Sequence, residues 1–245
     1  MKHIAIVFLL SLSTFLVKSQ EFDKNLNSDS LFHVFIKSVP AKLRKDITAS
    51  YNASSPKEKE LMLMMLLMPE SSKKQLIRNI DTNYQNIWHL KVLYDSLVPK
   101  GLRVYVEFKP KEVFFYKGES IDLWCSAIDS AGNNKSVFQE WSLELTSPKL
   151  DSLLKIVGWQ RSAIVMIKKA LQKANCISIT NGEPSEIGFA RSGMGKYFYS
   201  LFSTALTPKH IAEYNDKCTY IYYKRNIVLQ YGGGAVGSQC FPDKN

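Results

Sequence analysis

Histidine is scarce in this sequence, and the motifs of metal and nucleotide sites are missing from it. The 245 residues contain four histidines, and no H-E-x-x-H pair, acidic calcium loop or G-x-G-x-x-G fingerprint occurs in the chain. The cysteines are also too far apart for a zinc site, which needs close pairs such as C-x-x-C. Metal or cofactor dependence therefore has no support, and we assign no metal site, no cofactor and no catalytic residue.

Long apolar runs are absent after Val17. The longest later run, Leu61 to Met68, is ended by Pro69 and is much shorter than the ~20 residues that a membrane-spanning helix needs. Consecutive basic residues occur only as pairs, such as Lys168-Lys169. We therefore expect neither a transmembrane protein nor a dedicated nucleic-acid binder.

The first residues have the pattern of a secretory leader. Lys2 supplies a positive start, Ile4 to Val17 form an apolar run, and Val17-Lys18-Ser19 resembles a cleavage site. We expect residues 1–19 to be a signal peptide that is removed, so that the mature chain begins at Gln20 or Glu21. The predicted location is secreted or periplasmic.

The charge is basic after the leader as well. The formal net charge is +10, and loss of Lys2 and Lys18 leaves +8. An excess of this size attracts anions, so the predicted partner is another protein or an anionic surface. A solubilising surface excess explains the same composition.

The four cysteines predict disulfides. Their number is even and the expected compartment is oxidising. One sequence cannot choose between the possible pairings, although Cys218 with Cys240 would close the shortest loop. The candidates are Cys125, Cys176, Cys218 and Cys240.

Residues 20–98 have a helical pattern. Pro40 suits the first turn of a helix, and Ser55 is placed to cap a second helix that runs from Pro56 to Met68. Ser71 or Ser72 is a plausible cap for a third helix, which Pro99-Lys100-Gly101 ends. We place a domain boundary there, before residues 99–245.

The pattern changes from helical to alternating after Gly101. Alternation predicts strands over residues 102–145, a helix follows over 150–174, and further antiparallel strands are expected over 176–232, with a hairpin around Lys224-Arg225. The predicted fold class is α+β, with a helical N-terminal region followed by an antiparallel β-sheet that one long helix covers.

Two segments are candidate binding sites. The first is the glycine-rich run after the last strand, whose backbone N–H groups can approach an anion closely; its simpler interpretation is a bent exit from the strand. The second is the basic side of the 153–173 helix, which is also what an ordinary solvated helix face looks like. The candidate residues are Gly232, Gly233, Gly234, Ser238, Lys168, Lys169, Lys173 and Trp159.

The preferred functional prediction is an exported, non-catalytic protein that binds another macromolecule, as inhibitors, immunity proteins and envelope-accessory proteins do. One alternative is a hydrolase or transferase that uses the Gly232–Cys240 loop with His210 nearby. Another is a peptide or lipid carrier that uses the methionine-rich helix around Leu61 to Met68. The simpler interpretation of that helix is a central core helix, because it is apolar on all sides.

Overall fold

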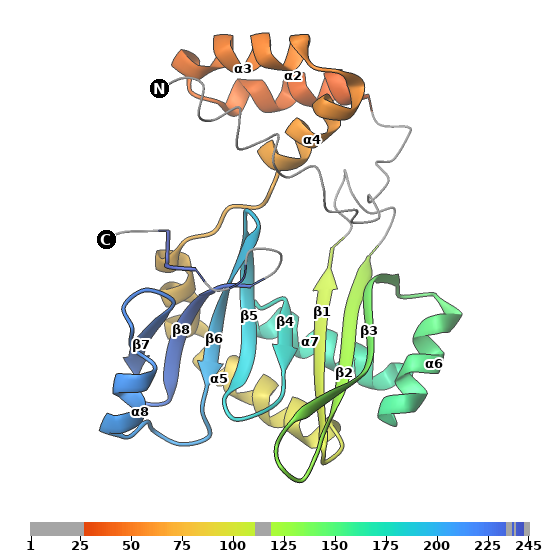
Figure 1. The fold of residues 1–245 in the computed structure, drawn as a ribbon, viewed down its shortest axis with the longest axis vertical. Coiled ribbons are helices and arrows are strands. Elements are labelled where there is room, and N and C mark those ends of the chain that lie inside the picture. Colours follow the sequence, from red (N-terminus) through yellow and green to blue (C-terminus); the bar gives the residue numbers. More distant parts are fainter. Residues whose placement is uncertain (1–26, 111–118, 234–236, 238, 243–245) are drawn as a thin grey trace.

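The computed structural model describes residues 27–110, 119–233, 237 and 239–242, so the expected signal peptide lies outside it. The fold is α+β: N-terminal helices precede an eight-stranded antiparallel sheet, and further helices pack against that sheet (Figure 1). The helices are α2 Ser28–Ser38, α3 Ala41–Ala53, α4 Pro56–Leu66, α5 Lys73–Leu97, α6 Pro148–Val157, α7 Arg161–Ala174 and α8 Pro208–Glu213. The strands are β1 Leu102–Lys109, β2 Ser120–Ile128, β3 Asn134–Glu144, β4 Ser178–Thr180, β5 Ser185–Ser192, β6 Gly195–Leu201, β7 Tyr220–Lys224 and β8 Ile227–Gly232. None of the described helices is long and apolar enough to cross a membrane.

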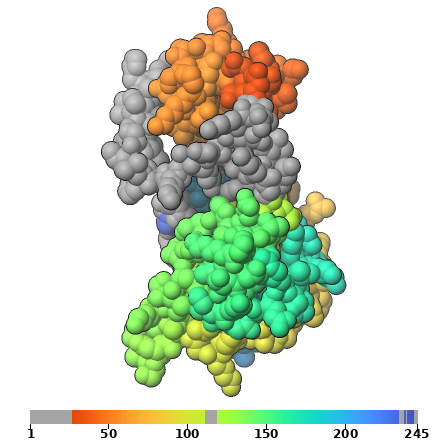
Figure 2. Space-filling view, turned by 90° about the vertical axis from the view of Figure 1, so that its right-hand side faces the viewer, coloured from red at the N-terminus to blue at the C-terminus, as the bar shows by residue number. Residues whose placement is uncertain are grey.

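Helices α2, α3 and α4 form a small unit with a core of its own, which Figure 2 shows as a separate lobe above the sheet. Phe32 stacks on Tyr51 with ring centroids 3.8 Å apart, and Leu63 of α4 completes this cluster. Ser55 caps α4 in a capping box with Glu58, as the sequence predicts. The helical prediction for this region is therefore confirmed.

The methionine-rich helix α4 is not a central core helix, and that interpretation was wrong. Leu63 is its only fully buried residue, whereas Leu61 and Met65 are 42% and 45% exposed. The apolar run is longer than the small core of the α2–α4 unit can cover. The carrier alternative therefore stays a prediction.

Helix α5 belongs to the core of the sheet. Ser72 caps it, with Gln75 completing a capping box, and its buried stripe includes Leu76, Ile80 and Tyr94. The packing therefore changes at residues 67–72, whereas the sequence pattern changes at Pro99–Gly101. The same segment contacts the β5–β6 turn, because the Gly193 N–H donates to the Pro69 carbonyl (2.9 Å).

Helices α5 and α7 cover one face of the sheet, whereas the sequence predicts a single covering helix. The expected 150–174 helix is divided, because Gly158 takes a left-handed conformation (φ 78°) that ends α6, and α7 begins after Gln160. Helices α5 and α7 pack on each other and on the sheet behind the strands in Figure 1.

The sheet consists of two halves joined at its centre, with a further hairpin at one edge. Its order is β3-β2-β1-β4-β5-β6-β8-β7, and each half is a helix followed along the chain by a three-stranded meander. Strands β1 and β4 join the halves through pairs that include Val106 with Ile179 and Glu107 with Ser178. Helix α5 precedes β1 but packs on β5 and β6, whereas α7 crosses behind β1 and β2 (Figure 1).

Alternation along the strands separates an apolar face from a polar one. On β1, Val104 and Val106 enter the core beneath the helices, and Tyr105 and Glu107 lie on the opposite side. We call this opposite side the open face, because α5 and α7 do not cover it. Among the described elements, the short helix α8 lies over one corner of it, where Val228 packs with two apolar residues of the preceding loop.

The cysteines follow the prediction only in part. Cys218 and Cys240 form a disulfide, which ties the C-terminal segment to the start of β7. Cys125 and Cys176 are free thiols, so the prediction that they form disulfides was wrong. Both are buried in the main apolar core, where a cysteine packs as a small hydrophobic residue.

Candidate functional site

A buried ionic cluster occupies the middle of the open face. Glu107 is 1% exposed, and its carboxylate accepts hydrogen bonds from Lys196 Nζ (2.8 Å), Arg191 Nε (2.7 Å) and the Tyr105 hydroxyl. Lys196 Nζ also donates to the Tyr105 oxygen (2.8 Å) and to Ser178 Oγ (3.1 Å). Each group is therefore held by at least one charged neighbour.

Strand register brings these residues together from distant parts of the chain. Glu107 of β1 lies opposite Ser178 of β4, and Arg191 of β5 lies opposite Lys196 of β6. Gly188 makes room between them, because a Cβ atom there would lie 2.0 Å from Ser178 Oγ. A glycine at this position is thus required by packing rather than by backbone conformation.

A second buried carboxylate extends the cluster toward β3. Asp122 of β2 is fully buried; its Oδ1 accepts from the Ser142 backbone N–H (2.7 Å), and its Oδ2 lies 2.7 Å from Lys109 Nζ. Arg191 Nη2 lies 4.0 Å from the same oxygen, so Arg191 links the two carboxylates. With Asp122 and Lys109 included, the ionic cluster contains three cations (Lys109, Arg191 and Lys196) and two carboxylates.

Mutual interactions fix the protonation states of this cluster. Burial by itself raises the pKa of Glu107. The positive charges of Lys196 and Arg191 lower it by more than burial raises it, so the pKa of Glu107 is about 2. Burial and the charge of Glu107 raise the pKa of Tyr105 well above its ordinary value. Burial lowers the pKa of Lys196, and attraction to Glu107 offsets part of that change. At neutral pH Glu107 is ionised and Tyr105 protonated, which suits fixed binding groups better than general acid–base catalysts.

Aromatic rings lie beside the charged groups. Trp124 stacks on Tyr105 with centroids 5.5 Å apart, and Lys196 Nζ lies 4.7 Å from the centre of the Phe198 ring. Near the β3 edge, Trp141 is 55% exposed. The open face therefore combines flat apolar rings with hydrogen-bonding groups.

A polar pocket of about 260 Å³ lies on the same face, next to α8. Arg103 Nη2 is 3.8 Å from the Glu186 carboxylate. Burial raises the pKa values of Tyr214 and Tyr220; the charge of Glu213 and then that of Glu186 add to the rise at Tyr214, and the charge of Glu186 adds to it at Tyr220. Ser200 Oγ donates to Gln230 Oε1 (3.1 Å) and so orients that amide. The lining residues are Arg103, Glu183, Pro184, Glu186, Ser200, Tyr214, Tyr220 and Gln230.

Several groups in this polar pocket can still form hydrogen bonds. The Arg103 side chain is partly exposed, and its Nη2 lies 3.8 Å from Glu186, whereas its Nε is buried and has no hydrogen-bond partner among the described residues. Within the same residues, the Tyr214 and Tyr220 hydroxyls and the Gln230 Nε2 group also have no hydrogen bond. The pocket thus offers donors from Arg103 and Gln230 and an acceptor from Glu186.

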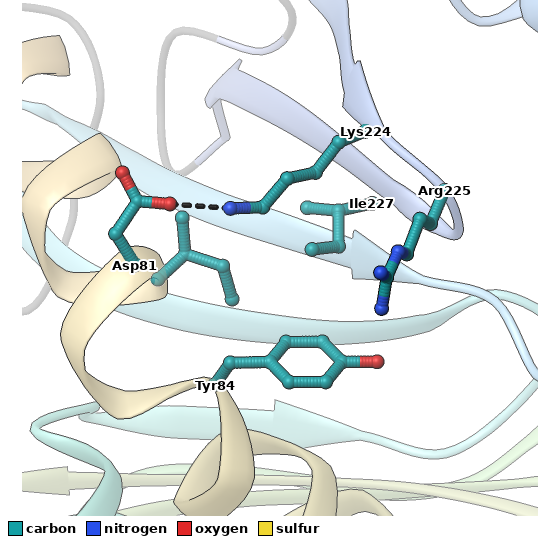
Figure 3. A pocket seen from close by; sticks show the side chains of 6 residues that line it. Asp81, Tyr84, Lys224, Arg225 and Ile227 are labelled. Atoms are coloured by element: carbon teal, nitrogen blue, oxygen red, sulfur yellow. Dashed lines mark hydrogen bonds and ion pairs between the residues drawn. The ribbon is translucent and has the colours of Figure 1, made fainter.

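A second pocket, of about 250 Å³, lies between α5 and the β7–β8 turn (Figure 3). Isoleucines form its floor, and charged side chains stand at its mouth. We call it the α5–hairpin pocket. Its lining residues are Ile80, Asp81, Tyr84, Lys224, Arg225 and Ile227.

The predicted glycine-rich site lies close to the ionic cluster. Gly232 and Gly233 have φ angles of 129° and 87°, and the Gly233 N–H donates to the Gly237 carbonyl (2.6 Å). A Cβ atom on Gly233 would lie 3.3 Å from the Phe198 ring. The described glycines therefore form a bent strand exit beside the open face, and Gly234 and Ser238 lie outside the described residues.

Cys240 is not available as a nucleophile for the catalytic alternative. Cys240 is bonded to Cys218, and a disulfide sulfur cannot act as a thiolate nucleophile. His210 is exposed on α8. No cluster of three or more His, Cys, Asp or Glu side chains that could hold a metal ion occurs in the described part of the chain.

The basic side of α7 is present, but Trp159 is not part of it. Lys168 pairs with Glu119, and Lys169 and Lys173 are exposed. Trp159 is 6% exposed and its Nε1 donates to the Leu97 carbonyl (2.8 Å), so its predicted place beside the lysines is corrected. The break after α6 turns this ring into the core. Binding by the three lysines stays a prediction.

Sequence reasoning did not identify the open-face cluster. The available signal was the alternation in β1, where Tyr105 and Glu107 stand between apolar residues, but their partners come from strands that only the sheet order reveals.

Comparison of the chain with protein-family models, with curated proteins and with solved structures found no match.

Proposed function

We propose that the chain is an exported, non-catalytic binding protein whose open face receives a hydroxyl-rich polymer of the polysaccharide class. The polar pocket is the observation that carries this proposal. It presents Arg103, Glu186 and Gln230 together, with two tyrosine hydroxyls that have no partner among the described residues. A ligand with many hydroxyl groups can donate to the carboxylate and accept from the other two side chains.

The charge of this pocket favours a neutral ligand. The lining holds one cation, Arg103, and two carboxylates, but Glu183 already accepts hydrogen bonds from the Ser203 N–H and hydroxyl. The groups left to a ligand, Arg103 and Glu186, carry opposite charges at close range, so a ligand of either sign would meet one group that repels it. A volume of about 260 Å³ accommodates one sugar ring in place of water. Neutral polyols therefore fit better than anions or amines.

The rest of the open face supports a polymer rather than a single sugar. Trp124, which stacks on Tyr105, and Trp141, which is exposed on the edge strand β3, are rings that can pack on the apolar faces of further sugar units. The Glu107 cluster on the same face is held by its own ion pairs, so its groups need no reorganisation on binding. The predicted leader and the Cys218–Cys240 disulfide support an extracytoplasmic location.

Affinity electrophoresis tests the proposal. The purified protein would be run in native gels that contain dextran, mannan, xylan or the anionic polymer alginate. We expect at least one neutral polymer to retard the protein, and Glu186→Gln and Gln230→Ala to reduce that retardation. Gln85→Ala is the matched control, because Gln85 is exposed on α5, on the helix side of the sheet, and lies outside both pockets.

Three results would count against the proposal: no retardation by any neutral polymer, retardation by alginate alone, or retardation that both pocket variants leave unchanged. Release of reducing ends from a polymer would instead favour the hydrolase alternative.

A further inference from the structure

The α5–hairpin pocket lies on the helix side of the sheet and is independent of the open face. Ile80 and Ile227 lie at its base but are 0% and 1% exposed, so the apolar surface that a ligand can reach belongs to the half-buried Tyr84 ring, which forms one wall, and to the aliphatic stems of the lysine and arginine at the mouth. Figure 3 shows Lys224 and Asp81 paired on one side of the space, and Arg225 extending toward Tyr84 on the other. The pocket therefore combines an apolar interior with a charged mouth.

The helix wall of the pocket is shaped by a local departure from helical geometry. Asn83 has φ −117° and ψ 15° inside α5, and its side chain donates to Asn79 Oδ1 (2.7 Å). Tyr84 follows directly, and its hydroxyl donates to Asn226 Oδ1 (3.4 Å) across the pocket. The kink and this hydrogen bond hold the Tyr84 ring at the wall.

The hairpin wall is anchored by hydrogen bonds to the segment that follows β6. Asn226 Nδ2 donates to the Phe202 carbonyl (2.7 Å), and the Arg225 carbonyl accepts from the Leu206 N–H (2.9 Å). Arg225 itself has a left-handed backbone (φ 51°) at the turn. The base of the Arg225 side chain is therefore fixed in position relative to the isoleucine floor.

The two cations at the mouth differ in how they are compensated. Asp81 accepts hydrogen bonds from Lys224 and from the Tyr223 hydroxyl, and the bond from Lys224 lowers the pKa of Asp81 and raises that of Lys224. Lys224 is thus neutralised by its own partner. Arg225 has no ion pair with any described residue and is exposed at the mouth. One positive charge is left for a ligand.

We infer that the α5–hairpin pocket binds a small ligand with an apolar body and a single carboxylate. The body would pack on the Tyr84 ring above the isoleucine base, and the carboxylate would accept paired hydrogen bonds from the Arg225 guanidinium. A volume of about 250 Å³ lies below the ~300–1,000 Å³ typical of drug-sized ligands. A short aliphatic acid and the apolar C-terminal residue of a peptide share this chemistry.

Amide chemical shifts of the purified protein test the inference with matched probes. We expect hexanoate to shift the signals of residues 80–84 and 224–227 in a saturable manner, and hexanamide, which has the same body without the charge, to bind at least about tenfold more weakly. Acetyl-glycyl-leucine with a free carboxylate distinguishes the two sources: tighter binding than hexanoate indicates a peptide C terminus, and weaker binding indicates a free acid.

Two variants locate the charge that the ligand needs. Arg225→Met should weaken hexanoate binding about tenfold or more. Lys135→Met removes the same charge from an exposed position at the start of β3 and should leave binding unchanged. The inference is overturned if neither acid produces localised saturable shifts, if hexanamide binds as well as hexanoate, or if the two variants bind hexanoate equally.

Discussion

Replacement of Glu107 by glutamine should be among the most destabilising single changes on the open face. Two estimates give its size. A pKa that is 4.5 in the unfolded chain and about 2 in the fold corresponds to about 3 kcal/mol. Removal of one partner from a buried ion pair costs about 3–5 kcal/mol, because the other charge stays buried. Lys196 is that other charge, at 2.8 Å.

The loss should depend on pH in a defined direction. The folded-state pKa of Glu107 lies below the unfolded value, so the carboxylate stabilises the fold fully above about pH 4.5. This contribution is lost as the pH falls from 4.5 toward 2. The difference in stability between wild type and Glu107→Gln should therefore be largest at pH 7 and smaller at pH 3.

Urea denaturation followed by tryptophan fluorescence measures this difference. Combining Glu107→Gln with Lys196→Met should cost less than the sum of the two single changes, because no unpaired lysine is then buried. The reasoning is refuted if Glu107→Gln lowers the unfolding free energy by less than about 1 kcal/mol at pH 7, or if the loss does not shrink at low pH.

Three further changes test the packing. Replacing both Cys218 and Cys240 by serine opens a loop with a sequence separation of 22 and should lower the unfolding free energy by about 3 kcal/mol; an unchanged urea midpoint would contradict this. Gly188→Ala should cost about 1–3 kcal/mol, because the new Cβ would lie 2.0 Å from Ser178 Oγ, and adding Ser178→Gly should recover most of the lost melting temperature. Asn79→Ala removes buried hydrogen bonds to the carbonyl of the last residue of α7 and to a β6 tyrosine, and should cost about 1–3 kcal/mol by the same measurement; a loss below about 0.5 kcal/mol would argue that these bonds contribute little.

Local features of the fold could be read from the sequence because their causes are local. Ser55 and Ser72 cap helices through residues three positions away, and the alternation in β1 is a property of one strand. The hairpin around Lys224-Arg225 was likewise predictable, because both of its strands and its turn are contiguous. The α+β class and most strand positions follow from such signals.

The candidate sites depend on contacts between distant segments. Glu107 meets Arg191 and Lys196 at sequence separations of 84 and 89, and only the pairing of β1 with β4 brings these strands together. In the sequence, Lys196 simply follows a glycine-containing turn, and nothing near it indicates that it pairs with Glu107. Trp159 was misplaced for a related reason, because a short break between α6 and α7 changes the direction of its ring. Side-chain direction after a break is not a periodic property.

The exchange of helices between the two halves of the sheet limits how the chain can be divided. Helix α5 leads into β1 yet shields β5 and β6, so a fragment that stops after β3 would expose the apolar side of its strands and leave α5 without its main support. A fragment that begins at α7 would lack α5 in the same way. Residues 73–232 should therefore melt in one cooperative transition, and any truncation for expression or crystallisation has to keep both halves.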